Sequence, residues 1–286
     1  MGAAFSVENL CFKYPSSKED TIKGIGFDVH EGEIFGLLGP SGAGKSTTQK
    51  ILIKLLENYR GTIRYFGSDL NALGNSYYEE IGVGFEVPVH FSKLTALENM
   101  RYFSGFYKKT ADIQELMERV GLWEYRNVKV GEFSKGMKVR LNFVRAMLNN
   151  PRVLFLDEVT NGLDPKNARI IKDMIAEYRA KGGTVFLTTH LMNDVEQLCD
   201  RVAFCVNGRL IETSTPRDLK LRYGKREVKV EYRENGTIAS AVFSLDGIGH
   251  DDEFIELLRS GKIETIHSGE TSMEEIFIIV TGVELK

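Results

Sequence analysis

Residues 39–46 read GPSGAGKS and constrain the fold more than any other segment of the chain. The apolar run before them predicts a strand. After them, a helix would place Ile51, Leu52, Leu55 and Leu56 on one face. A glycine-rich loop between a strand and a helix lets backbone N–H groups converge on phosphate at the positive end of the helix. The sequence therefore predicts an α/β fold built around a phosphate-binding loop.

The loop matches the complete Walker A pattern, G-x-x-x-x-G-K-S. Lys45 is expected to neutralise the β- and γ-phosphate oxygens, and the Ser46 hydroxyl is expected to bind Mg²⁺. ATP and Mg²⁺ are therefore the predicted cofactors. Many unrelated proteins share such a loop, so other segments must show how the nucleotide is used. The residues predicted to line the nucleotide are Gly39, Pro40, Ser41, Gly42, Ala43, Gly44, Lys45, Ser46 and Thr47.

A second apolar run, VLFL, leads directly into the acidic pair Asp157 and Glu158. Such a continuous run is typical of a strand that is buried on both faces of a parallel sheet. Asp157, at the end of that strand, is expected to hold Mg²⁺ through water. Glu158 is expected to act as the general base that takes a proton from the attacking water.

The composition narrows the class of protein. The chain has 286 residues, 42% apolar and 27% charged, which is typical of a folded protein with one large and one small domain. Its 37 basic and 40 acidic residues give a net charge of −3, which argues against a nucleic-acid partner. No apolar run approaches the roughly 18–20 residues that cross a bilayer, and we expect no secretory leader.

Further motifs follow one another in a characteristic order. FSKGM, residues 133–137, precedes the acidic pair, and NGLDP with Asp164 follows it; Tyr14 lies before the phosphate loop, and His190 follows a predicted strand. These segments resemble the signature, D-loop, adenine-stacking aromatic and switch histidine of ATP-binding cassette (ABC) ATPases, over roughly residues 4–215. The resemblance implies a P-loop NTPase core and ATP hydrolysis in which His190 takes part.

The resemblance also implies partners. In this family two ATPase subunits meet around two ATP molecules, so Ser134 and Gly136 would contact the ATP held by the other subunit. The second subunit is expected to be the same chain, and a different chain is an open alternative. The signature variant and the segment SMEEIFIIVTG look like the ATPase subunits of one-cassette bacterial exporters, which pair with a separate integral membrane permease. The expected location is the cytoplasmic face of the cell membrane.

The sequence departs from the usual family pattern at several positions. Phe133, Lys135 and Met137 replace leucine, glycine and glutamine in the signature. Val159 replaces a proline after the acidic pair, and neither change removes a catalytic group. Glu86 lies where the family's Q-loop has glutamine. We hypothesise that Glu86 takes the Q-loop role and contacts Mg²⁺, where its negative charge would alter metal affinity or the hydrolysis rate.

Changes in sequence texture divide the chain into two expected domains. Residues 1–224 form the ATPase domain, in which about 87–150 are a mainly helical insert that begins with a capping box at Thr95. Residues 225–286 read as a small α/β domain that contains a strand pair around Asn-Gly at 235–236. Two helical patterns follow the strand pair, DDEFIELLRS at 251–260 and SMEEIFIIVTGV at 272–283. The role of this second domain stays open: dimer contact, regulation and permease docking all fit.

Three functional interpretations are considered, and the one that we favour is a transport ATPase that powers an exporter. The main alternative is a soluble ABC ATPase acting in translation or DNA repair. Translation-type members usually carry two cassettes in one chain, and repair-type members carry long coiled-coil or zinc insertions. This chain shows neither feature. A regulatory or storage protein without turnover is disfavoured by Glu158 and His190. The cargo, and export as opposed to import, are not determined by the sequence.

Overall fold

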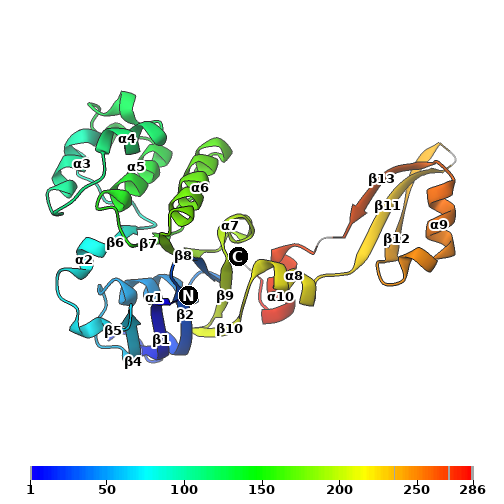
Figure 1. Cartoon of the computed structure of the whole chain (residues 1–286), viewed down its shortest axis with the longest axis horizontal. Coiled ribbons are helices and arrows are strands. Elements are labelled where there is room, and N and C mark those ends of the chain that lie inside the picture. The colour runs from blue at the N-terminus through cyan, green and yellow to red at the C-terminus, as the bar shows by residue number, and fades with distance from the viewer. Residues whose placement is uncertain (1, 235, 270, 285–286) are drawn as a thin grey trace. The chain divides into compact units, whose positions relative to one another are not determined.

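The computed structural model describes residues 2–234, 236–269 and 271–284, and the described strands form three sheets (Figure 1). The chain divides into a first compact unit, residues 1–215 with 284–286, and a second, residues 216–283. The expected boundary at residue 224 lies after α8 (Pro216–Tyr223) instead of before it. Helix α8 belongs to the second unit because it packs against α10 (Met273–Thr281).

The central sheet of the first unit has the strand order β10-β9-β3-β8-β7-β6. All neighbours run parallel except β10, which forms a hairpin with β9. Every residue of β3, β7 and β8 is buried, as the apolar runs predict. The carboxyl ends of these strands meet at one edge, which is where open α/β sheets bind ligands. The strands are β3 (Ile34–Leu38), β6 (Ile81–Gly84), β7 (Val153–Asp157), β8 (Thr184–Thr189), β9 (Arg201–Val206) and β10 (Arg209–Ser214).

An antiparallel sheet of order β2-β1-β4-β5 shares one hydrophobic core with the central sheet. Aromatic rings join the two: Phe5 of β1 meets Phe155 of β7 edge-on at 5.6 Å, and Phe27 of β2 stacks on Phe35 of β3 at 5.3 Å. This core holds the phosphate loop and its helix in place. The elements are β1 (Ala3–Phe12), β2 (Ile22–His30), β4 (Arg60–Tyr65), β5 (Ser68–Asp69), α1 (Lys45–Leu52) and α2 (Tyr77–Glu80).

The helix after the phosphate loop is shorter than the apolar pattern predicts. Helix α1 ends at Leu52, and Lys54 adopts a left-handed φ of 57° that turns the chain away. The prediction that Leu55 lies on the buried helical face is therefore wrong. Leu55 is 59% exposed.

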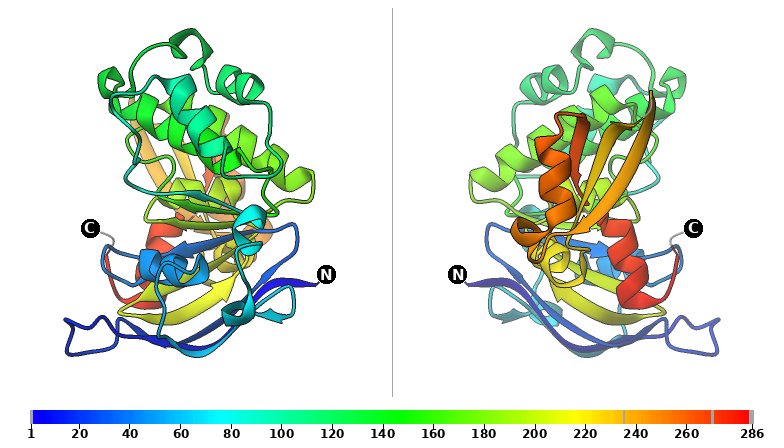
Figure 2. Two further views of the ribbon diagram at one scale, coloured as in Figure 1. Left: turned by 90° about the vertical axis from the view of Figure 1, so that its left-hand side faces the viewer. Right: turned by 90° about the vertical axis from the view of Figure 1, so that its right-hand side faces the viewer.

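A helical group occupies the predicted insert. Its main helices are α3 (Ala96–Ser104), α4 (Ile113–Arg119) and α5 (Lys135–Met147). In both views of Figure 2 these green helices lie on the opposite side of the unit from the blue β1–β2 strands. Thr95 and Glu98 form the predicted capping box. Helices α6 (Pro165–Ala180) and α7 (Met192–Leu198) follow the insert along the chain. Asp164 caps α6, and Pro165 is its first residue, as predicted.

The second unit contains a three-stranded antiparallel sheet of order β12-β11-β13. Helix α9 covers one face of this sheet through a small core that includes Val230, Phe243 and Phe254. The strand pair and the two helical segments were predicted, whereas α8 and β13 were not. Of the predicted Asn-Gly turn, residue 235 lies outside the described residues. The bounds are β11 (Glu227–Glu234), β12 (Thr237–Ser244), β13 (Ile263–Ser268) and α9 (Asp252–Arg259).

No helix within the described parts of the chain is both long and apolar enough to span a membrane.

Candidate nucleotide-binding and hydrolysis site

The phosphate loop owes its shape to its glycines. Gly42 and Gly44 adopt φ angles of 78° and 107°, which disfavour any side chain. A Cβ at Gly39 would lie 2.1 Å from the carbonyl oxygen of Cys205 on β9. Gly39 thus lets the loop pass close to β9, and Gly44 ends the turn at the start of α1. The loop therefore requires glycine at positions 39, 42 and 44.

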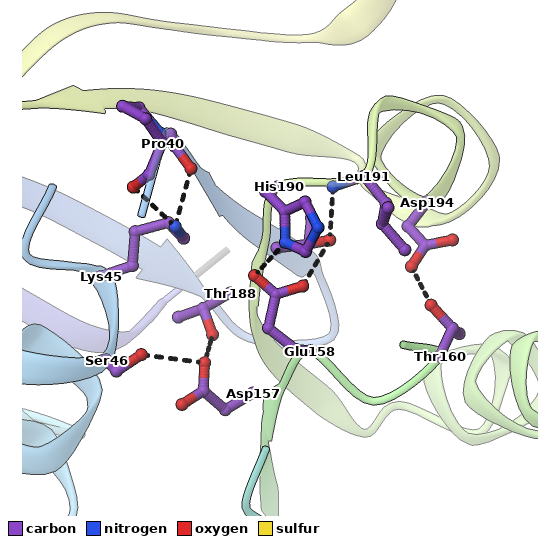
Figure 3. Close-up of polar contacts among 12 residues, drawn as sticks. Pro40, Lys45, Ser46, Asp157, Glu158, Thr160, Thr188, His190, Leu191 and Asp194 are labelled. Atoms are coloured by element: carbon purple, nitrogen blue, oxygen red, sulfur yellow. Dashed lines mark hydrogen bonds and ion pairs between the residues drawn. The ribbon is translucent and has the colours of Figure 1, made fainter. Parts of the chain in front are cut away.

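Lys45 closes the loop upon itself. Its Nζ donates to the carbonyl oxygens of Gly39 at 2.7 Å and Pro40 at 3.1 Å (Figure 3). Burial lowers the pKa of the Lys45 ammonium, and the nearby carboxylate of Glu158 opposes that shift. An ammonium that is buried against carbonyl oxygens is held ready to exchange them for a better anionic partner such as phosphate.

Three oxygen-bearing side chains gather at the carboxyl ends of β7 and β8. Ser46 Oγ donates to Asp157 Oδ1 at 3.2 Å, and the Thr188 hydroxyl donates to the same carboxylate oxygen. The residues are 111 and 31 positions apart, so only the fold brings them together. Hydroxyl and carboxylate oxygens suit Mg²⁺, a hard cation that keeps several waters and shares the phosphate oxygens of its substrate. The donors that are present therefore fit Mg²⁺.

Glu158 lies beside this group and faces His190. The Oε1 atom of Glu158 lies 2.8 Å from His190 Nδ1, and the Thr189 hydroxyl lies 3.4 Å from Oε2 (Figure 3). Burial raises the pKa of the Glu158 carboxyl, and the hydrogen bond with His190 opposes this shift. Glu158 also adopts a left-handed φ of 51°, an uncommon conformation for a side chain of this size. A buried carboxyl with a raised pKa and a fixed partner has the properties of a general base.

Lys45, Ser46, Glu158 and His190 line a cavity of about 480 Å³, whereas Asp157 is not among its lining residues. Tyr14 lies in its wall and shares a 3.2 Å hydrogen bond with Thr47, so the predicted adenine-stacking residue is beside the loop. Glu86 lines the same cavity, and its negative charge favours the charged form of the Lys45 ammonium, which opposes the lowering of the Lys45 pKa by burial. The full lining is Tyr14, Thr21, Ser41, Gly42, Gly44, Lys45, Ser46, Thr47, Glu86, Glu158 and His190.

The predicted signature and D-loop residues are absent from the lining of this cavity. Ser134 caps helix α5, where its hydroxyl accepts from Met137 N at 3.2 Å. Gly136 follows in the first turn of the same helix. Asp164 caps α6, and the backbone N–H of Asn167 lowers the pKa of its carboxyl. Their action on a nucleotide held by another subunit stays a prediction.

Sequence reasoning missed three threonines of the site. Thr21 lines the cavity, Thr188 hydrogen-bonds Asp157, and Thr189 contacts Glu158. The last two end a predicted strand immediately before His190, in the segment TVFLTTH. The rule that parallel strands bring their carboxyl ends to one edge would have found them. Thr21 follows no comparable pattern.

A phosphate loop at the edge of a parallel sheet, with a hydroxyl–carboxylate pair and a buried glutamate beside it, defines a P-loop nucleotide hydrolase. Comparisons with known proteins narrow this class. A family profile described as ABC transporter matches residues 22–161. A second, described as the fluoroquinolone efflux ABC transporter C-terminal domain, matches residues 226–270.

Relatives and solved structures agree with these profiles. A fluoroquinolones export ATP-binding protein of Mycobacterium tuberculosis is 49% identical over 281 residues, which cover 98% of this chain and 93% of the relative. The Nod factor export ATP-binding protein I of Burkholderia orbicola is 37% identical over 69% of this chain and 67% of its own length. A solved ATP-binding subunit of an ABC transporter superposes with a TM-score of 0.70, at 30% identity, over 77% of this chain and 93% of its own.

The chain belongs to the ATP-binding subunits of the ABC transporter family. It is an ATPase whose hydrolysis of ATP is coupled to transport across a membrane. The predicted fold class, a P-loop NTPase core with a further C-terminal domain, is confirmed. The alternative interpretations, a soluble ATPase of translation or repair and a protein without turnover, are set aside.

Proposed function

We propose that this chain powers an exporter of fluoroquinolones. The observation that carries this proposal is the 49% identity to a fluoroquinolones export ATP-binding protein, which extends over both units. The second profile, which is described as the fluoroquinolone efflux ABC transporter C-terminal domain, matches residues that lie wholly within the second unit. The Nod factor relative, by contrast, matches about two thirds of the chain.

Five residues of the cavity have proposed roles in ATP binding and hydrolysis. Lys45 leaves the loop carbonyls and binds the β- and γ-phosphate oxygens. Glu158 takes the proton of the attacking water, while His190 holds the carboxylate in place and contacts the γ-phosphate. Tyr14 stacks on the adenine ring. Glu86 takes the Q-loop position at the edge of the phosphate site.

Ser46 and Asp157 are the residues that would hold Mg²⁺, with Glu86 as a further candidate. Bound there, the ion would supply charge neutralisation for the phosphate oxygens. The hydroxyl of Thr188 fixes the orientation of the Asp157 carboxylate, because it occupies one lone pair of Oδ1. The protein's own contribution is thus a pair of oxygens that are already oriented before the nucleotide arrives.

A second subunit completes each site in this proposal. Ser134, at the N-terminus of α5, would donate to the γ-phosphate of the ATP held by the partner's loop, and Gly136 would let the backbone approach. Loss of the γ-phosphate removes these contacts and lets the subunits part. The related dimeric ATP-binding cassette bound to ADP and Pi supports this arrangement, at 25% identity and a TM-score of 0.67 over 74% of this chain and 98% of its own.

The permease would dock on an apolar groove of about 310 Å³ beside the helical insert. Leu55, displaced by the early end of α1, forms part of its wall with Phe85 and Phe103. Exposed aromatic side chains such as Phe106, 65% exposed, lie on the neighbouring insert. Exposed apolar surface of this kind marks a protein contact. The chain would then sit at the cytoplasmic face of the membrane, held there by its permease.

The export proposal is tested in drug-sensitive bacteria that express the chain together with its permease. Accumulation of a fluorescent fluoroquinolone is measured for the wild type and for Lys45→Ala. We expect lower accumulation only with the wild-type chain. Equal accumulation with both chains would refute fluoroquinolone export, whereas ATP hydrolysis is tested separately by phosphate release.

A further inference from the structure

A buried polar cluster lies outside the nucleotide cavity, between α6 and α7. The Thr160 hydroxyl donates to Asp194 Oδ2, and Lys172 Nζ lies 2.6 Å from Asp194 Oδ1. Lys172 also donates to Gln197 Oε1 at 3.0 Å. The side chains of Lys172 and Asp194 are only 10% and 5% exposed. None of these residues lines the cavity.

The cluster joins the two segments that carry the catalytic groups. Thr160 lies two residues after Glu158, in the turn that leads to the D-loop. Asp194 lies in the first turn of α7, four residues after His190. The same two segments also meet at Glu158 and His190 (Figure 3). The two segments are therefore connected by two contacts: Glu158 with His190 at the nucleotide cavity, and Thr160 with Asp194 outside it.

We propose that Asp194 is a positioning residue that holds Thr160 and thereby fixes the backbone on which Glu158 is carried. The start of the turn is tied to β8, because Glu158 N donates to Thr188 O at 3.0 Å. After Glu158 the turn has two further backbone bonds: Glu158 O accepts from Asn161 N at 3.0 Å, and Thr160 O accepts from Leu163 N at 3.2 Å. Both of these further bonds lie within the turn, so they hold its shape but not its position. The bond from Thr160 to Asp194 reaches a different element.

Lys172 keeps the Asp194 carboxylate in the orientation in which it accepts the hydrogen bond from Thr160. A carboxylate is an acceptor only, and here each oxygen has one donor, Thr160 on Oδ2 and Lys172 on Oδ1. Rotation of the side chain would leave a buried charge without its partner, which is costly. The pair thus connects α6, α7 and the turn after Glu158.

The inference depends on the proposed role of Glu158 and is tested in the full-length chain. Thr160→Val removes the hydroxyl while keeping the shape of the side chain. We expect kcat for ATP hydrolysis to fall about tenfold or more, since small misplacements of catalytic groups cost up to about 100-fold. The KM for ATP should stay within twofold of wild type, and Thr160→Ser should restore most of the rate. Turnover is expressed per nucleotide-binding site, so that loss of folded protein does not count.

A matched control is Thr184→Val at the opposite end of β8. The Thr184 side chain is also buried and accepts from Gly32 N at 2.9 Å, far along the strand from His190. It should lower the melting temperature without lowering kcat. In a Lys172→Met/Asp194→Leu background, Thr160→Val should cause no further loss.

Three results would overturn the inference: a kcat for Thr160→Val within twofold of wild type, an equal kcat loss in Thr184→Val, or an undiminished Thr160→Val effect in the Lys172→Met/Asp194→Leu background. Loss of turnover in Glu158→Gln tests the proposed base independently. A failure of that role is thus distinguished from a failure of the positioning inference.

Discussion

Replacing Glu158 by glutamine removes one charge and one base while keeping the volume of the side chain. The amide oxygen can still face Thr189, and the contact with His190 can persist in the appropriate tautomer. The buried site therefore stays packed. In the proposed mechanism, what is lost is the group that accepts a proton from the attacking water.

The expected loss of rate follows from that role. General-base catalysis contributes between about 10² and 10⁴ in rate, which corresponds to roughly 3 to 5 kcal/mol of activation free energy. The affinity for ATP should not fall, because a negative charge has been removed from beside the triphosphate. Phosphate release at saturating ATP measures the first quantity, and nucleotide binding measures the second.

Glu158→Gln should lower the rate of hydrolysis but raise the stability of the ligand-free protein at neutral pH. The folded-state pKa of Glu158 lies above the ordinary 4.5, so the folded chain holds this proton more tightly than the unfolded chain. The free energy of unfolding therefore falls as pH rises from 4.5 through the folded-state pKa. Glu158→Gln, which mimics the protonated form, should have a higher melting temperature than wild type at neutral pH and the same one well below pH 4.5.

The same carboxyl sets the acidic limit of activity. If Glu158 is the base, hydrolysis requires its ionised form, so the rate should fall as pH decreases through a value above 4.5. The hydrogen bond with His190 holds this pKa down, so His190→Ala should move the acidic limit to higher pH. The reasoning is refuted if Glu158→Gln keeps more than a tenth of wild-type turnover, or if the melting temperature drops at neutral pH.

Other predictions concern the remaining features of the site. A mixture of Lys45→Ala and Ser134→Ala chains should regain about a quarter of wild-type phosphate release, since half the dimers are mixed and one of their two sites is intact; no recovery would contradict sites shared between subunits. Glu86→Gln should lower the KM for ATP severalfold and shift the Mg²⁺ dependence of steady-state hydrolysis, because one repulsive charge leaves the cavity; unchanged values would exclude Glu86 from the Q-loop role. Leu55→Ser should weaken co-purification with the permease but leave phosphate release by the isolated chain unchanged, while Ile211→Ser, also at an exposed apolar residue of the first unit, should affect neither.

The second unit illustrates where sequence patterns lose their power. Its strand pair was predicted from alternation, and its helices α9 and α10 were predicted from helical patterns. Strand β13 was missed because four of its six residues are polar or charged, and it is recognisable as a strand only through its pairing with β11. Helix α8 was missed because it carries several charges and buries little beyond Leu219.

Local chemistry was sufficient for the phosphate loop, the acidic pair and the helix caps. Glycine at Gly44 and the capping side chains at Thr95 and Asp164 act within a few residues, so the sequence alone determined those features. The apolar runs also determined which strands lie inside the sheet. Nothing in these signals required knowledge of distant neighbours.

Contacts between distant residues were decided by the tertiary structure alone. Thr188 bonds Asp157, and Asp194 bonds Thr160, because parallel strands and the helices after them converge at one edge of the sheet. No local sequence pattern predicts that a hydroxyl and a carboxylate more than thirty residues apart will form a hydrogen bond. Short-range conformational preference is written into neighbouring residues, whereas the pairing of buried polar groups depends on which elements the core brings together.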